Sequence, residues 1–290
     1  HDYIRSSDLI VNIGHDVVEK PPFFMEHGGT SVVHINYKSA QVDQVYFPQM
    51  EVIGDIALSM DALADCFGLD SSFALKEFYQ VRDFVRHMTT ASLEEISFPP
   101  KPPHLVAQIR QSMGYHDIIT LDNGVYKIWF ARNYPAFQPN TILLDNALAT
   151  MGAGLPSAMT ASMLYPNRKV MAICGDGGFM MNSQELETAV RLKLNLVVLI
   201  LNDSSYGMIR WKQEGMGFKD WGLEYSNPDF SLYAQSYGVT PHAIQEHNSL
   251  PMVIDEAFGS GGVHLIDLPV DYSDNVKNLI SDLAEHEPVI

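Results

Sequence analysis

Oxygen-bearing side chains follow two apolar segments of the chain, at the point where each segment ends. Segment 170–174 runs into Asp176, which lies between glycines, and segment 196–201 runs into Asn202 and Asp203. Mg²⁺ typically binds one or two carboxylates together with carbonyl, water and phosphate oxygens. The glycines permit positive φ and let backbone N–H groups approach a phosphate closely. These residues predict a site in which a metal ion bridges the protein to a diphosphate.

The two segments must be neighbouring parallel strands for this site to form. Their apolar residues are typical of buried strands, and residues 183–194 between them have helical spacing. Asn182, three residues before Glu185, resembles a capping box and predicts the start of that helix. A helix of about twelve residues is about 18 Å long and can return the chain parallel to the first strand. Asp176 and Asp203, 27 positions apart, would then emerge side by side beyond the carboxyl ends of the strands, where open α/β sheets bind ligands.

Strands and helices alternate through the rest of this region, residues 104–275. Apolar runs bounded by turn residues predict strands at 118–122, 141–144, 240–244 and 263–268. Helical spacing predicts helices at 104–113, 125–132 and 152–164. This alternation is typical of an α/β fold with a doubly wound parallel sheet sandwiched by helices.

A smaller α/β region precedes it. The apolar runs predict three strands and one helix, at 8–14, 31–35, 51–55 and 56–66. Three strands are few for a complete domain. Residues 1–70 are therefore expected to be part of a larger domain.

A proline-rich segment separates the two regions. Residues 98–103 contain four prolines, a composition that we expect to exclude a helix or a central strand. We expect a linker at 71–103. Residues 67–103 are predicted to be mixed helix and loop, and the prolines that end them to form a stiff, extended segment. Residues 276–290 are expected to form a C-terminal tail.

Composition excludes several classes of protein. The 290 residues are 46% hydrophobic, enough for a buried core, and the net charge is −17. A surface this acidic argues against binding to nucleic acids or to anionic membranes. No run of 18 apolar residues occurs, and the two cysteines, Cys66 and Cys174, do not suggest a disulfide framework. A cytoplasmic protein is the simplest interpretation.

Four stretches of the sequence resemble the thiamine-diphosphate (ThDP) enzymes, and acetolactate synthases most closely. The stretches are residues 149–156, 175–179, 185–193 and 206–208. In that family Gly-Asp-Gly is followed by an Asn-rich strand end some 25–30 residues later. The resemblance implies that residues 104–275 form the domain that binds the ThDP diphosphate and Mg²⁺. It also implies that residues 1–70 are the C-terminal portion of the family's Rossmann-like central domain. Asp203, where many relatives have Asn, resembles the catabolic, FAD-independent branch, so FAD is allowed but not favoured.

The resemblance also implies roles for individual residues. Asp176 and Asp203 would bind Mg²⁺ through their side chains, and Ser205 through its carbonyl oxygen. Ala149 would accept a hydrogen bond from the aminopyrimidine, and Met151 would hold the cofactor in its bent, reactive conformation. The residues implied to bind the cofactor are Gly124, Val125, Tyr126, Ala149, Met151, Gly175, Asp176, Gly177, Gly178, Asp203, Ser205, Tyr206, Gly207 and Met208. Met151 and Met208 are those with an expected catalytic role.

Some positions depart from the family pattern. Val125 and Tyr126 stand where many biosynthetic members have Gln-His, which changes the side chains available to the diphosphate. The Trp that lines the entry channel of biosynthetic members has no clean counterpart, because Trp211 comes one position early and Lys212 takes its place. Trp211 fits a packed helix residue equally well. Tyr206, Met208 and Ile209 are expected to face the reacting carbons.

The implied reaction is that of acetolactate synthase, which decarboxylates pyruvate and condenses the resulting two-carbon carbanion with a second pyruvate to give 2-acetolactate. Alternatives within the cofactor class are a simple 2-oxoacid decarboxylase, glyoxylate carboligase and oxalyl-CoA decarboxylase. A different class is a non-catalytic nucleotide-binding module, with Gly14-His15-Asp16 as its phosphate turn. No Gly-x-Gly-x-x-Gly follows the first strand, which argues against that module.

One group expected in this family has no counterpart in the sequence. A glutamate from the neighbouring subunit's N-terminal domain activates the cofactor in relatives, and Glu185 and Glu187 are unsuitable substitutes. We therefore expect this chain to be part of a roughly twice-longer protein that is inactive as this part alone. A homodimer or homotetramer is expected, and the resemblance allows a small regulatory subunit.

Overall fold

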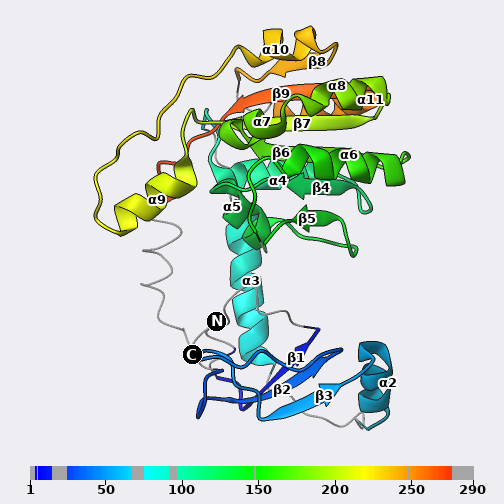
Figure 1. Cartoon of the computed structure of the whole chain (residues 1–290), viewed down its shortest axis with the longest axis vertical. Coiled ribbons are helices and arrows are strands. Elements are labelled where there is room, and N and C mark those ends of the chain that lie inside the picture. The colour runs from blue at the N-terminus through cyan, green and yellow to red at the C-terminus, as the bar shows by residue number, and fades with distance from the viewer. Residues whose placement is uncertain are drawn as a thin grey trace. The chain divides into compact units, whose positions relative to one another are not determined.

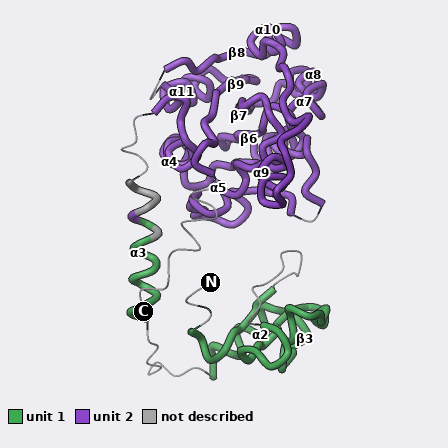
Figure 2. Tube along the Cα trace, turned by 90° about the vertical axis from the view of Figure 1, so that its left-hand side faces the viewer, with its two compact units in different colours: residues 1–86, 287–290 green, residues 87–286 purple. Residues whose placement is uncertain are grey.

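The computed structural model describes residues 4, 6–14, 25–66, 75–91, 97–146, 148–246 and 249–275. Figure 1 shows the elements in chain order, and Figure 2 shows two compact units, residues 1–86 with 287–290, and residues 87–286. The expected C-terminal tail, 276–290, lies outside the described residues, as do His15 and Asp16 of the alternative phosphate turn.

The smaller unit contains the three strands and the helix that the sequence predicts. Its parallel sheet has the order β1-β2-β3, with bounds Leu9–Ile13, Ser31–Asn36 and Met50–Ile53, and α2 spans Ile56–Cys66. Its described core is small: the buried hydrophobic residues are Met25, Val32, Ile35 and Tyr46.

The linker expected at 71–103 contains a helix, in agreement with the mixed helix and loop predicted over residues 67–103. α3 spans Lys76–Ala91, and the division between the two units falls inside it, after Arg86. The prolines that suggested an extended chain begin only at Pro99, so nothing in residues 76–91 prevents a helix.

The prolines themselves also permit a helix. α4 (Pro102–Ser112) begins with Pro102 and Pro103, two residues before the predicted start. The prediction was wrong because proline is excluded from a helix interior but not from the first turn, where its missing N–H has no intrahelical acceptor anyway.

The larger unit is built on a six-stranded, all-parallel sheet with the order β5-β4-β6-β7-β9-β8. The strands are β4 (Ile118–Leu121), β5 (Ile142–Leu144), β6 (Val170–Gly175), β7 (Leu196–Asn202), β8 (Thr240–Ala243) and β9 (Val263–Pro269). The helices after α4 are α5 (Tyr126–Asn133), α6 (Gly154–Leu164), α7 (Asp176–Asn182), α8 (Glu185–Arg191), α9 (Gly207–Gly215), α10 (Phe230–Ser236) and α11 (Leu250–Ser260).

Helices cover both faces of this sheet (Figure 1). Alternate strand residues point to opposite faces, so Ile173 and Leu199 pack with α4, α5 and α11. Cys174 and Ile200 pack on the other face with α6, α7, α8 and α10. This confirms the predicted doubly wound α/β fold. β6 and β7 are parallel neighbours, also as predicted.

The connection between β6 and β7 differs from the prediction. Two short helices, α7 and α8, replace the single helix expected at 183–194, and α7 begins at Asp176 itself. The capping box was wrong: the Asn182 amide donates to the carbonyl of Gly152 at 2.8 Å, and Gln184 is the N-cap of α8. This long-range hydrogen bond replaces the local N-capping role that the spacing of Asn182 suggested.

Two further features concern the chain as a whole. Cys66 and Cys174 are both free thiols, as expected. In the described part of the chain, no helix combines the length and apolar composition needed to cross a membrane.

Candidate functional site

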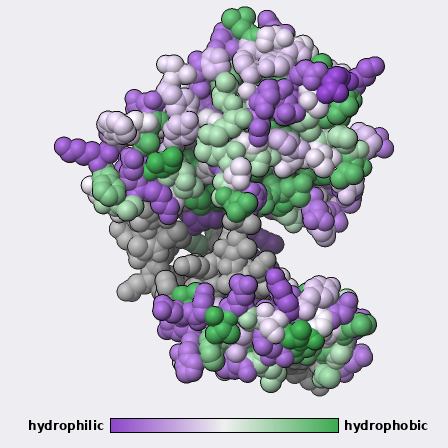
Figure 3. Space-filling model, in the orientation of Figure 1, coloured by the Kyte–Doolittle hydropathy of each residue, from purple (hydrophilic) through white to green (hydrophobic). Residues whose placement is uncertain are grey.

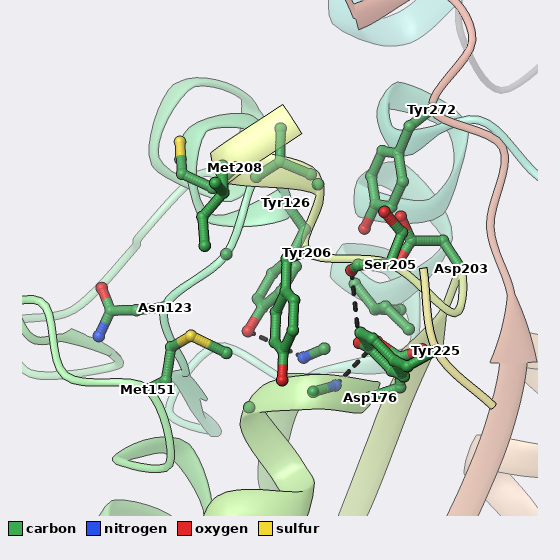
Figure 4. Close-up of a pocket in the computed structure, with 18 residues that line it drawn as sticks. Asn123, Tyr126, Met151, Asp176, Asp203, Ser205, Tyr206, Met208, Tyr225 and Tyr272 are labelled. Carbon is green, nitrogen blue, oxygen red and sulfur yellow. Dashed lines mark hydrogen bonds between the residues drawn. The ribbon is translucent and has the colours of Figure 1, made fainter. Parts of the chain in front are cut away.

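The order in which strands are added to the sheet of the larger unit reverses between β4 and β6. From β4 the chain moves through α5 to β5 at one edge, and from β6 it moves to β7 on the other side. Such a switch point leaves a crevice beyond the carboxyl ends of the strands, where ligands of open α/β sheets bind. A pocket of about 420 Å³, including the part open to solvent, is lined by residues that follow β4, β6 and β7 (Figure 4).

Thirteen of the fourteen residues assigned to the cofactor from the sequence line this pocket, and Ala149 does not. The thirteen are Gly124, Val125, Tyr126, Met151, Gly175, Asp176, Gly177, Gly178, Asp203, Ser205, Tyr206, Gly207 and Met208. Ile209 lines it as well. The sequence assigned no role to the other four: Asn123, Leu201, Tyr225 and Tyr272.

Three helices begin at the pocket, each after one of three adjacent strands. α5 follows β4, α7 follows β6 and α9 follows β7. In the described structure, none of their N-cap residues (Val125, Gly175 and Tyr206) provides a side-chain cap. The first turn of a helix has N–H groups without intrahelical acceptors and carries partial positive charge. Three such ends around one pocket favour an anionic ligand such as a diphosphate.

Asp176 supplies a buried carboxylate at the start of α7, where the residue is only 1% exposed. Oδ1 accepts hydrogen bonds from the N–H of Gly177 and the hydroxyl of Tyr225, each at 2.8 Å. Oδ2 accepts from the N–H of Ser204 at 2.7 Å and the amide of Asn227 at 2.6 Å. Such donors compensate a buried carboxylate for its lost hydration. The carboxylate is therefore held in a fixed orientation at the pocket wall.

Asp203 lies at the end of the neighbouring strand. Burial, and then the negative charge of Asp176, raise the pKa of the Asp203 carboxyl to about 7, although Arg210 opposes this rise. Ser205 follows two residues later, and its carbonyl oxygen lies 3.4 Å from the Tyr225 hydroxyl. Two carboxylates and a carbonyl at one sheet edge match the oxygen ligands of Mg²⁺. A cation there would also reduce the repulsion between the two carboxylates.

The protein does not complete such a ligand set by side chains alone. Across the described residues, no group of three or more His, Cys, Asp or Glu side chains could hold a metal ion. The buried hydroxyl of Ser205 has no hydrogen-bond partner among them. The arrangement therefore fits a cation that takes its remaining ligands from backbone, water or phosphate oxygens, as Mg²⁺ commonly does.

The glycines around Asp176 provide space rather than an unusual backbone. Gly175 has φ of −72°, and Gly177 and Gly178 also lack positive φ, because the turn is the beginning of α7. A Cβ on Gly177 would lie 2.6 Å from the Tyr225 hydroxyl, and one on Gly178 would lie 2.8 Å from Oδ2 of Asp122. A side chain at Gly177 would therefore displace Tyr225 from the pocket wall, and one at Gly178 would displace the buried Asp122.

A buried carboxylate at the end of β4 holds the loop that carries Met151. Asp122 is fully buried, and its two oxygens lie 2.9 and 3.0 Å from the N–H of Gly152. Gly152 has φ of 91°, a conformation that favours glycine. Together with the bond from Asn182 to the Gly152 carbonyl, these contacts fix Met151 in the pocket wall. Ala149 lies earlier on the same loop with φ of 48°.

Tyr126 reaches from α5 to the end of β6. Its hydroxyl accepts a hydrogen bond from the N–H of Gly175 at 2.9 Å, and burial raises the pKa of Tyr126 well above its usual value. Its hydroxyl thus contacts the backbone of the strand end. Trp211, one candidate for the entry channel, packs instead against the core and does not line the pocket.

Three residues at the site come from parts of the chain without a recognisable motif. Tyr225 and Asn227 follow α9 and donate to Asp176. Tyr272 follows β9, and its buried hydroxyl has no hydrogen-bond partner in the described structure. One sequence signal could have identified Tyr272: it lies just beyond the carboxyl end of a strand, the edge where ligands bind.

Comparison with known proteins identifies the family of the larger unit. The family model for the C-terminal TPP-binding domain of thiamine pyrophosphate enzymes matches residues 122–268. An acetolactate synthase of Bacillus subtilis (strain 168) is 32% identical over 98% of this chain and 50% of its own length. The catabolic acetolactate synthase of Raoultella terrigena is 31% identical over 94% of this chain and 49% of its own length.

A more distant relative is the large subunit of acetolactate synthase isozyme 2 of Escherichia coli (strain K12), 27% identical over 99% of this chain and 52% of the relative. The chain thus spans about half the length of the relatives that it matches. Thiamine pyrophosphate is ThDP, and the matched domain contains the pocket residues from Asn123 to Tyr225. The chain therefore belongs to the thiamine pyrophosphate enzyme family, with a C-terminal TPP-binding domain similar to that of acetolactate synthases.

Proposed function

We propose that this chain supplies the diphosphate- and Mg²⁺-binding half of an acetolactate synthase active site. One observation carries the proposal: Asp176, Asp203 and the Ser205 carbonyl line one pocket at which α5, α7 and α9 begin. Helix N-termini attract a diphosphate, and the paired carboxyl groups suit a divalent cation. Together they fit a diphosphate whose charge a divalent cation neutralises.

Each part of the pocket has a distinct task in this proposal. Asp176, Asp203 and the Ser205 carbonyl hold Mg²⁺, and the first N–H groups of the three helices hold the diphosphate. Met151, fixed by the Asp122 contacts, supports the bent conformation of the cofactor. Bound ThDP supplies the electron sink that loss of CO₂ from a 2-oxoacid requires.

The substrate side of the pocket is apolar. Met151, Met208 and Ile209 line it beside Tyr206, a lining that suits the methyl group of pyruvate. We propose that the enzyme decarboxylates one pyruvate and joins the two-carbon unit to a second pyruvate, giving 2-acetolactate. The names of two relatives above 30% identity, the acetolactate synthases of Bacillus subtilis and Raoultella terrigena, support this choice over other 2-oxoacid decarboxylases and carboligases.

The proposed enzyme is a homodimer or homotetramer whose activating glutamate comes from outside residues 1–290. Two exposed apolar side chains lie near the Met151 loop. Leu148 (85% exposed) precedes Met151 by three residues, and the Cβ of Met181 (50% exposed) lies 3.1 Å from where a Cβ on Gly152 would be. Figure 3 shows hydrophobic residues exposed among hydrophilic ones on one face of the larger unit. Apolar side chains exposed beside a site are typical of a surface that another chain covers. FAD is not part of the proposal.

The test is cofactor binding by the intact protein that contains this chain. Asp176→Ala is expected to abolish Mg²⁺-dependent ThDP binding in calorimetric titration, because the carboxylate that links metal and protein is lost. Asp176→Asn keeps the side-chain volume and checks that any loss is not due to unfolding. Asp255→Ala, which removes an exposed carboxylate on α11, is the matched control. Unchanged cofactor affinity in both Asp176 variants would refute the site.

A second measurement tests the reaction. Incubation with pyruvate should yield 2-acetolactate, detected as acetoin after acid treatment. Free acetaldehyde without acetolactate would instead identify a simple decarboxylase and refute the carboligation.

A further inference from the structure

The Asp176 carboxylate has no acceptor site left for a cation. A carboxylate has about four lone-pair sites on its two oxygens, and Asp176 accepts four hydrogen bonds. Two donors are the backbone N–H groups of Gly177 and Ser204, which are fixed by the start of α7 and the end of β7. The other two are side chains, those of Tyr225 and Asn227. A cation that binds Asp176 must therefore displace a side-chain donor.

Tyr225 is the donor in the position that a cation would need. Its hydroxyl lies 2.8 Å from Oδ1 of Asp176 and 3.4 Å from the carbonyl oxygen of Ser205, two of the proposed ligands. It also lies 2.6 Å from the position of a Cβ on Gly177. Figure 4 shows Tyr225 beside Asp176 and below Ser205. The hydroxyl thus bridges the groups proposed to bind the metal.

Asn227 donates more hydrogen bonds than Tyr225, whose ring packs against that of Tyr206 with centroids 4.7 Å apart. Its amide nitrogen also donates to the side-chain oxygens of Asn202 at 2.9 Å and Ser204 at 3.3 Å. A cation that removed Asn227 would break these contacts as well. Tyr225 has hydrogen bonds only to the two proposed ligands through its hydroxyl, among the described contacts. Tyr225 is therefore the donor that can leave.

The backbone around Tyr225 does not have to move for this exchange. The Tyr225 N–H donates to the carbonyl of Ser204 at 3.2 Å, and the Tyr206 N–H donates to the carbonyl of Leu223 at 3.0 Å. Ser205 and Glu224 form an antiparallel bridge between these bonds. The segment is thus attached to the site by its main chain. Rotation of the Tyr225 side chain alone would free Asp176 and the Ser205 carbonyl.

We propose that Tyr225 is a displaceable gate on the metal site, whose hydroxyl competes with the divalent cation for Asp176 and the Ser205 carbonyl. The proposal rests on the proposed function, because it takes those two groups as metal ligands. Cation binding turns the Tyr225 side chain away, and loss of the cation returns it. The hydroxyl therefore lowers the affinity for the cation while it keeps Asp176 hydrogen-bonded when no cation is bound.

The experiment measures Mn²⁺, a paramagnetic substitute for Mg²⁺, by electron paramagnetic resonance of the free ion in the presence of ThDP. Tyr225→Phe in the intact protein removes the competing hydroxyl and keeps the ring. We expect it to bind Mn²⁺ about tenfold more tightly than the wild type, a difference of about 1.4 kcal/mol. Tyr115→Phe, in an exposed ring that stacks on Phe137, is the matched control and should leave affinity unchanged.

A second substitution covers the case in which the ring alone blocks the site. Tyr225→Leu removes ring and hydroxyl, and it too should bind Mn²⁺ more tightly. Wild-type or weaker affinity in both variants would overturn the gate, since weaker binding would mean that Tyr225 positions Asp176 for the metal. Asp176→Ala, which leaves no side-chain oxygen for the metal, separates the two proposals. If it binds Mn²⁺ as well as the wild type, the metal site itself is wrong; if it binds weakly while the Tyr225 variants match the wild type, only the gate is wrong.

Discussion

Acidification is expected to weaken cation binding because it protonates Asp203. The pKa of this carboxyl is raised to about 7, first by burial and then by the charge of Asp176. A raised carboxyl pKa means that the group is neutral below about pH 7 and ionised above it. A metal ligand must be deprotonated, so the affinity for Mg²⁺ should fall as the pH decreases through this value.

The size of the effect follows from the ionised fraction. With a pKa of about 7, Asp203 is about nine-tenths ionised near pH 8 and about one-tenth ionised near pH 6. Apparent affinity scales with the fraction of protein in the binding-competent state. The dissociation constant should therefore rise about tenfold between these pH values, equivalent to about 1.4 kcal/mol. An aspartate with an ordinary pKa near 3.9 would produce almost no change in the same range.

Calorimetric titration of Mg²⁺ in the presence of ThDP at several pH values measures this dependence. Repeating it in two buffers with different ionisation enthalpies counts the protons released, about one near pH 6 and almost none near pH 8. Asp203→Asn is the control, because it keeps an oxygen ligand but cannot titrate in this range, and it retains any pH dependence of ThDP itself. If the wild type and Asp203→Asn have the same pH dependence, Asp203 is not the titrating ligand.

Other predictions concern stability and use the midpoint of thermal unfolding. Gly154→Ala places a Cβ 2.8 Å from the Cβ of Asp122 and the Sγ of Cys174, and this overpacking should destabilise the protein by about 1–3 kcal/mol. Gly259→Ala, also in a helix but with nothing within 4 Å of its Cβ, should instead stabilise by about 0.5–1 kcal/mol; equal effects of the two substitutions would refute the packing argument. Tyr272→Phe should change stability by less than about 1 kcal/mol, because the hydroxyl that it removes has no partner in the described structure. A larger loss of stability would reveal a hydrogen bond from the Tyr272 hydroxyl to a group outside the described residues.

The position of the site was predictable because strand pairing follows from pattern and connection length. Two apolar runs joined by a crossover of limited length are parallel neighbours, and β6 and β7 pair with Gly175 opposite Leu201. That register alone places Asp176 and Asp203 at one edge of the sheet. The rule that ligands bind beyond the carboxyl ends then identified the pocket side of the sheet.

Other features depend on contacts between distant residues and had no local signal. The capping pattern at Asn182 was misleading because the Asn182 side-chain amide donates a hydrogen bond to the carbonyl of Gly152, thirty positions earlier in the chain. Tyr225 and Asn227 reach Asp176 from a segment 49 and 51 positions later, where no motif marks them. A pattern of residue types indicates which face or edge a residue belongs to. It does not determine which side chain crosses a pocket from another loop.

The carboxyl group of Asp176 is buried and that of Asp203 is partly buried, and in both places a negative charge is costly. The two groups reduce this cost in different ways, which allows one more test. Asp176 is compensated by four hydrogen-bond donors, one of them the Tyr225 hydroxyl. Asp203 retains a proton up to about pH 7. A single cation would therefore replace a hydroxyl at one carboxylate and a proton at the other. Because the two exchanges concern different carboxylates, the roughly tenfold pH effect should persist in Tyr225→Phe when Mn²⁺ is titrated near pH 6 and near pH 8. Its disappearance in that variant would mean that the hydroxyl and the proton share one position between the two carboxylates, and the site would then contain one switch instead of two.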